Sequence, residues 1–101
     1  MSKKLSGLLG LAKKAGALCV GRMATEEQLA RKNVALLLFA RNSSTTLQAK
    51  LIKKFSPVNH RKLDLTTDAL GKVLGRKEIG VIGVCNTHLA KEIQNQLDSP
   101  F

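Results

Sequence analysis

Aromatic side chains are almost missing from this sequence. Tryptophan and tyrosine are absent, and Phe39, Phe55 and Phe101 are its only aromatic residues. Proteins that bind single-stranded nucleic acid by stacking bases on aromatic rings need more such side chains than this. The composition therefore gives that mode of binding little support.

Cysteine is scarce too. Cys19 and Cys85 each lie inside an apolar stretch, without a Cys-x-x-Cys motif or a histidine at metal-ligand spacing. We therefore predict two buried free thiols in a reducing compartment, and no metal site. A disulfide between the two, or a catalytic cysteine acting with His60 or His88, is the alternative.

Long apolar runs are absent as well, and none approaches the length that crosses a membrane. The segment 5–12, preceded by lysines and followed by Ala15-Gly16-Ala17, has features of a signal peptide. It is short, however, runs into further lysines, and repeats its leucines and alanines at helical spacing. We expect a docked amphipathic helix over residues 2–15 in a cytoplasmic protein without a membrane partner. A membrane-surface helix, lacking Trp or Phe, is the weaker alternative.

Acidic residues are few, and this shortage says most about function. The chain has 17 Lys and Arg against 7 Asp and Glu, which gives a net charge of +10. Residues 1–32 hold seven bases and two acids, residues 33–64 six and one, and residues 65–101 four and four. Like charges repel one another in a small fold, so such an excess usually serves a polyanionic partner. Nucleic acid is the first candidate.

A chain of 101 residues with 44% apolar side chains is expected to fold as one domain over residues 1–101. Helical periodicity alternates with short apolar runs, and the unbroken runs 34–40 and 79–85 are typical of central strands. This alternation predicts a three-layer α/β/α sandwich with a four-stranded mixed sheet. The other expected strands are residues 18–20 and a weak segment near Val58. A second helix is expected over residues 23–32, and a third from one of the caps at 42–44 to about residue 55. A fourth helix is expected from residue 66 or 67 to residue 75, and a fifth from residue 86 or 87 onward.

Glycines and small polar residues mark the helix ends. Gly16, Asn33 and Gly75 occupy stop positions. Between the third and fourth helices, His60-Arg61-Lys62 is interpreted as a basic loop. The capping candidates are Asn42, Ser43 or Ser44 for the third helix, Thr66 or Thr67 for the fourth, and Asn86 or Thr87 for the fifth.

Gly21 and Arg22 form the first candidate site, between the strand 18–20 and the next helix. A glycine there lets a partner's backbone approach closely, and the free amides of a helix N-terminus suit phosphate oxygens. Arg22 would add a charged fork beside them. An ordinary strand-to-helix turn is the alternative.

Arg76 and Lys77 form the second candidate site. They follow Gly75 on a loop before the strand 79–85, and binding residues concentrate on such loops. A solvated charged turn is the alternative. The candidate rim charges are Lys13, Lys14 and Arg41.

The order of these segments resembles a known family. Gly21 followed by a ten-residue helix, the run 34–40, a capped helix and then Leu70-Gly71-Lys72 through Gly75 is similar to the ribosomal protein L7Ae/L30e/S12e family. The resemblance extends over residues 5–97. The opening Leu8-Leu9-Gly10-Leu11-Ala12 and the Ala15-Gly16 break resemble the bacterial YlxQ-type RNA-binding proteins within that family.

This resemblance implies an L30e-like fold whose RNA face combines the start of the second helix with the loop after the fourth. Family members that bind kink-turns do so through Gly-x-Asn-Glu-x-x-Lys. On this chain the glycine is Gly21, whereas Met23, Ala24 and Glu27 replace the other three. Because these replacements remove hydrogen bonds to base edges, phosphate contacts are expected to dominate. The family's further contacts, carried across, fall near Ser44, Gln48 and Thr67, with Arg76 and Lys77 on the second loop.

The sequence as a whole predicts a non-catalytic, ribosome-associated protein that binds structured RNA, ribosomal or kink-turn-like, by shape and phosphate contacts. The alternative is a protein-interaction module on the same fold that has lost specific RNA binding. An enzyme is disfavoured because the acidic residues are scattered. No cofactor and no small-molecule substrate is expected.

Overall fold

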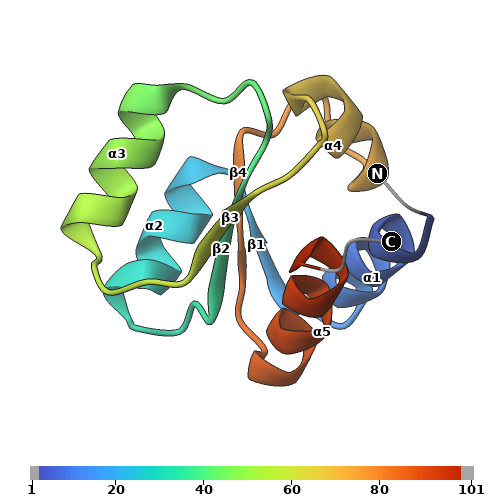
Figure 1. Ribbon diagram of the computed structural model, residues 1–101, viewed down its shortest axis with the longest axis horizontal. Helices are drawn as coiled ribbons and strands as arrows, with labels where there is room; N and C mark the ends of the chain where they lie inside the picture. The colour runs from blue at the N-terminus through green and yellow to red at the C-terminus, as the bar shows by residue number, and fades with distance from the viewer. Residues whose placement is uncertain (1–2, 99–101) are drawn as a thin grey trace.

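The protein is a three-layer α/β/α sandwich, as predicted. In the computed structural model, which describes residues 3–98, a four-stranded sheet lies between two layers of helices (Figure 1). One layer is formed by α2 (Arg22–Ala30) and α3 (Thr45–Lys54). The other layer is formed by α1 (Lys3–Lys14), α4 (Thr67–Val73) and α5 (Thr87–Asp98), and the strands are β1 (Leu18–Val20), β2 (Leu36–Phe39), β3 (His60–Lys62) and β4 (Val81–Val84).

The sheet has the strand order β1-β4-β2-β3, which places β2 and β4 in its centre. Every residue of these two strands is buried, so the apolar runs 34–40 and 79–85 form central strands, as predicted. Strand β4 is antiparallel to both of its neighbours, whereas β2 and β3 are parallel. As a result β1, β2 and β3 all end where β4 begins. We call this the loop end of the sheet; it lies near the top of Figure 1.

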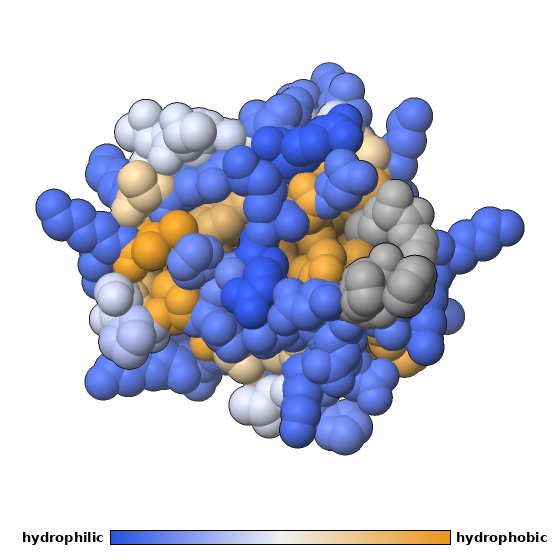
Figure 2. All heavy atoms as spheres, viewed as in Figure 1, coloured by the Kyte–Doolittle hydropathy of each residue, from blue (hydrophilic) through white to orange (hydrophobic). Residues whose placement is uncertain are grey.

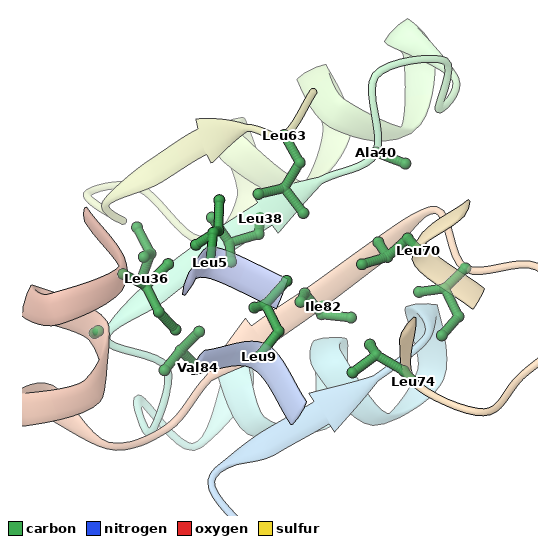
Figure 3. Close-up of a cluster of buried hydrophobic side chains, with 13 residues drawn as sticks. Leu5, Leu9, Leu36, Leu38, Ala40, Leu63, Leu70, Leu74, Ile82 and Val84 are labelled. Carbon is green, nitrogen blue, oxygen red and sulfur yellow. The ribbon is translucent and has the colours of Figure 1, made fainter. Parts of the chain in front are cut away.

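The two central strands supply both halves of the core. Successive side chains of a strand point to opposite faces of the sheet. Leu36 and Leu38 therefore join a cluster under α1, α4 and α5, whereas Leu37 and Phe39 join a second cluster under α2 and α3. Figure 3 shows the first cluster, in which Leu5, Leu9, Leu70 and Leu74 surround Leu36, Leu38, Ile82 and Val84. Burying one such side chain contributes about 1.5–3 kcal/mol, so both faces hold the sheet in place.

Strand β3 departs from the prediction. A weak strand was expected near Val58 and a loop at His60–Lys62, but His60–Lys62 is itself the strand that pairs with β2. Its side chains are exposed or half-buried, as an edge position allows. Basic side chains on an edge strand also discourage pairing with a second sheet. Figure 2 shows hydrophilic atoms along this central part of the surface, between two apolar areas.

The end of α2 also differs from the prediction. The helix stops at Ala30, before the stop position expected at Asn33, and it is Lys32 that adopts a left-handed φ of 60°. The Asn33 side chain instead donates a hydrogen bond to Gln28 Oε1 at 3.0 Å. Ser2, the predicted first residue of α1, lies outside the described residues. None of the helices within residues 3–98 is long and apolar enough to cross a membrane.

The structure selects one cap from each set of candidates. The side-chain oxygens of Ser44, Thr66 and Asn86 accept a hydrogen bond from the amide three residues later, at 3.3, 3.2 and 2.9 Å. Gly16 and Gly75 adopt φ values of 72° and 70° after α1 and α4, as predicted. Helices α3, α4 and α5 therefore begin with a satisfied cap.

The loop between α4 and β4 folds back onto α4 at Gly71. The Arg76 amide donates to the Gly71 carbonyl at 2.7 Å. A Cβ at Gly71 would lie only 2.6 Å from the backbone oxygen of Lys77. The absence of a side chain at Gly71 thus fixes where Arg76 and Lys77 lie.

We predict that Gly71→Ala lowers the free energy of unfolding by about 1–3 kcal/mol, because the backbone of the loop must move. Gly10→Ala is the matched control, since a Cβ there has no neighbour within 4 Å. That change is expected to raise stability by about 0.4–1 kcal/mol. Urea denaturation of both variants measures the difference. Equal effects of the two substitutions would show that the loop does not rest on Gly71.

Candidate functional site

Four separate segments meet at the loop end of the sheet. The Gly21 amide donates to the Val81 carbonyl at 3.0 Å, which places the start of α2 beside the start of β4. The Ala40 amide donates to Gly80 at 2.9 Å, and the Ile79 amide donates to Thr67 at 3.1 Å. The segments after β1, β2 and β3 therefore flank the loop that carries Arg76 and Lys77. The two sites predicted separately therefore lie at the same end of the sheet.

The N-terminus of α2 lacks a side-chain cap. Gly21 is its N-cap residue, with φ 88° and ψ 168°, a left-handed φ that favours glycine. The first backbone hydrogen bond of the helix runs from the Thr25 amide to the Gly21 carbonyl at 3.1 Å. The amides of residues 22–24 therefore point out of the helix without an intrahelical acceptor. Such amides, at the positive end of the helix dipole, attract an anion.

Thr25 fixes this helix start to the sheet. Its side chain is fully buried, and its Oγ1 donates to the Cys19 carbonyl in β1 at 3.3 Å. Together with the bond from Gly21 to Val81, this contact holds the first turn of α2 before any ligand arrives. Preorganised donors lose less entropy on binding than mobile ones.

The cations at the loop end differ in how they are paired. Arg22 lies 3.3 Å from Glu26, and Arg41 lies 2.8 Å from Asp64. Within the part of the chain that the structure describes, Arg76 makes no ion pair, and neither does Lys77. Exposed ion pairs are weak, so a phosphate can compete for the two paired arginines. The loop cations are available without that competition.

Lys13 has a structural contact. Its ammonium Nζ donates to the Leu74 carbonyl, at the C-terminal end of α4. Carbonyls at a helix C-terminus lack intrahelical donors, and a lysine there satisfies one of them. Lys13 therefore ties α1 to the base of the loop rather than standing free as a rim charge. Lys14 remains exposed and lines a surface hollow of about 640 Å³ with Leu11 and Gly75.

The side chains expected at base-reading positions offer few hydrogen bonds. Met23 is 87% exposed, and Ala24 is half-buried. The Ser44 hydroxyl is occupied as the cap of α3. Glu27 lies 3.1 Å from Arg31, the pairing that the i,i+4 spacing allows. The surface therefore offers backbone amides and cations more than side-chain readers.

Two contacts that shape this surface were not predicted. The Asn42 side chain accepts the Thr67 amide at 2.8 Å, so a residue expected to cap α3 instead satisfies the first amide of α4. The Gln48 side chain donates to Ser43 Oγ at 2.9 Å, which occupies its amide group. The first bond joins residues 25 apart and depends on tertiary structure, so the sequence carries no signal for it, whereas the second is a local contact at the start of α3.

Neither histidine lies at the loop end of the sheet. His60 opens β3, and His88 lies in the first turn of α5. Within residues 3–98, no group of three or more His, Cys, Asp or Glu side chains is arranged to hold a metal ion.

No protein-family model matches the chain, and no curated protein matches it. Among solved structures, it is similar to a protein of unknown function from Bacillus halodurans C, with a TM-score of 0.85 and 24% sequence identity. The similarity covers 98% of this chain and 100% of that one. At this level of identity the likeness shows the fold, and it supports the three-layer architecture.

We predict that Lys13→Met lowers the free energy of unfolding by about 1 kcal/mol, because it leaves the Leu74 carbonyl without its donor. Lys14→Met removes the same charge from the neighbouring exposed position and is expected to change stability by less than about 0.5 kcal/mol. Thermal unfolding of both variants compares them. A larger loss from Lys14→Met would contradict the structural assignment of Lys13.

Proposed function

We propose that this protein binds structured RNA without catalysing a reaction. The whole chain acts as one RNA-binding domain in the cytoplasm, in association with ribosomal or other folded RNA. The proposal rests on one observation: the uncapped N-terminus of α2 lies at the same end of the sheet as Arg76 and Lys77. Neither of these two cations forms an ion pair within the described residues.

The geometry suits several neighbouring phosphates. Backbone amides at residues 22–24 can receive one phosphate, Arg76 and Lys77 can each contact another, and Arg22 can contact a fourth. The bond from Gly21 to Val81 places these amides at the same end of the sheet as the loop that carries the cations. A net charge of +10 adds long-range attraction for a polyanion. Phosphate contacts of this kind position a protein on RNA.

Recognition by shape fits this surface better than recognition of base edges. A-form RNA hides base edges in a deep, narrow major groove, so proteins recognise it by its backbone and form. Met23 and Ala24 bring no polar group to the surface. The resemblance to the L7Ae/L30e/S12e family supports an RNA partner, and the loss of its Asn-Glu pair favours tolerance of base sequence.

The first test reverses the two loop cations. Arg76→Glu combined with Lys77→Glu is expected to weaken RNA binding at least about 30-fold and to reduce the salt slope by about 2, because two phosphate contacts are lost. The control, Lys50→Glu with Lys53→Glu, makes the same change of charge on exposed positions of α3. This control is expected to weaken RNA binding less than about threefold, because it changes only the long-range attraction between the protein and RNA. Fluorescence anisotropy with a labelled hairpin measures both, and equal losses would refute the proposed surface.

The second test varies salt and nucleic acid. The probes are an RNA hairpin with tandem sheared G·A pairs, a continuous RNA duplex and a DNA duplex of equal length. Between about 50 and 200 mM salt, three or four phosphate contacts predict a fall in affinity of about 40- to 150-fold. The RNA probes are expected to bind more tightly than DNA. Affinity that ignores salt, or that favours DNA, would contradict recognition of an RNA backbone.

A protein-interaction module is the second candidate function, and the exposure of Met23 favours it. An apolar side chain that is 87% exposed is suited to a protein partner. Purification of the tagged protein with and without ribonuclease separates the two functions. RNA-mediated association is lost on digestion, whereas a direct protein contact survives digestion and is weakened by Met23→Asp.

A further inference from the structure

The two cysteines, 66 residues apart in sequence, are in contact. Cys19 Sγ and Cys85 Sγ lie 3.6 Å apart. Cys19 is opposite Gly83 in the β1–β4 ladder, and the Cys85 amide donates to the Ala17 carbonyl at 2.7 Å. The cysteines are therefore diagonal neighbours on the same face of two antiparallel strands.

Gly83 provides the space for this contact. A Cβ at Gly83 would lie 2.6 Å from Cys19 Sγ, closer than real side-chain contacts allow. Any other residue at this position would push the Cys19 thiol away from its present place. The thiol also donates to the Gly83 carbonyl at 3.4 Å, which holds it beside Cys85.

The two thiols differ in access. Cys19 is 8% exposed, whereas Cys85 is half-buried and borders a surface hollow of about 300 Å³ with Lys32, Asn33 and Thr87. Lys32 gives the hollow a positive charge, which favours a reagent that carries carboxylates. A small molecule can thus reach Cys85, whereas Cys19 is buried next to Cys85.

We propose that Cys85 and Cys19 form a thiol–disulfide exchange site for small anionic disulfides such as oxidised glutathione. In the first step the Cys85 thiol loses its proton and attacks one sulfur of the reagent, which releases one small thiol and leaves a mixed disulfide. In the second step Cys19 loses its proton and attacks Cys85 Sγ, which releases the second small thiol. Two electrons pass from the cysteines to the reagent, and the two protons end on the released thiols.

The expected rate is low at neutral pH. Burial, and then the hydrogen bond with Cys19, raises the pKa of the Cys85 thiol from 9.0 to about 11. Since the thiolate is the nucleophile, only a small fraction of the protein reacts at any moment. The product would tie the edge strand β1 covalently to the central strand β4. This inference is independent of the proposed RNA binding.

The full-length protein is incubated for hours with oxidised glutathione and examined by intact mass and tryptic mapping. The expected product has lost two hydrogen atoms, carries no glutathione, and links the peptides 15–22 and 78–91. Its melting temperature is expected to rise by at least about 5 °C, because the crosslink restricts the unfolded chain. A stable glutathione adduct without closure, or only intermolecular dimers, would overturn the proposal.

Single substitutions assign the order of attack. Cys19→Ser is expected to stop at the mixed disulfide on Cys85, and Cys85→Ser is expected to remain unmodified because Cys19 is buried. Modification of Cys19 in Cys85→Ser at the wild-type rate would contradict the assigned roles.

Gly83→Ala tests the geometry of closure. The added methyl group displaces the Cys19 thiol, so the variant is expected to accumulate the mixed disulfide. Gly80→Ala is the matched control, at the residue that immediately precedes the same strand. Its Cβ would lie 3.6 Å from the Ser43 side chain, which is an ordinary van der Waals contact. The melting temperature of each variant is measured first, so that loss of closure is separated from loss of folding. Closure of folded Gly83→Ala at the wild-type rate would overturn the role of Gly83.

Discussion

The antiparallel pairing of β2 with β4 organises the whole sheet. Both strands are buried throughout, and their side chains alternate between the two halves of the core. Because β1 pairs with β4 and β3 pairs with β2, the central pair fixes the direction of every strand. Three strand ends and one strand start are thereby gathered at one end of the sheet. The candidate surface follows from this topology.

The fold was predictable where the sequence pattern reflects burial. The apolar runs 34–40 and 79–85 predicted the central strands, and the capping candidates included each cap that formed. Strand β3 was misplaced because an edge strand needs no apolar pattern, and His60–Lys62 carries none. The end of α2 was misplaced because Lys32 adopts a left-handed conformation, which a sequence predicts for glycine and not for lysine.

The candidate site was predictable in part. Gly21, Arg76 and Lys77 were identified from local features, and topology brings them together. The local environment of each charge was not predictable, since it depends on tertiary contacts. Lys13 is held by the end of α4, and Arg41 is paired with Asp64. Lys13 therefore stabilises the fold, whereas the exposed pair of Arg41 leaves that arginine open to competition by a ligand.

Amide NMR spectra recorded during titration with a structured RNA hairpin test whether the loop end of the sheet receives RNA phosphates. We expect the resonances of residues 21–24 and 75–77 to shift first and most. Residues 32 and 33, at the opposite end of the sheet, are expected to stay unchanged. Shifts confined to that opposite end or to the outer face of α3, with residues 21–24 unaffected, would refute RNA binding at the loop end.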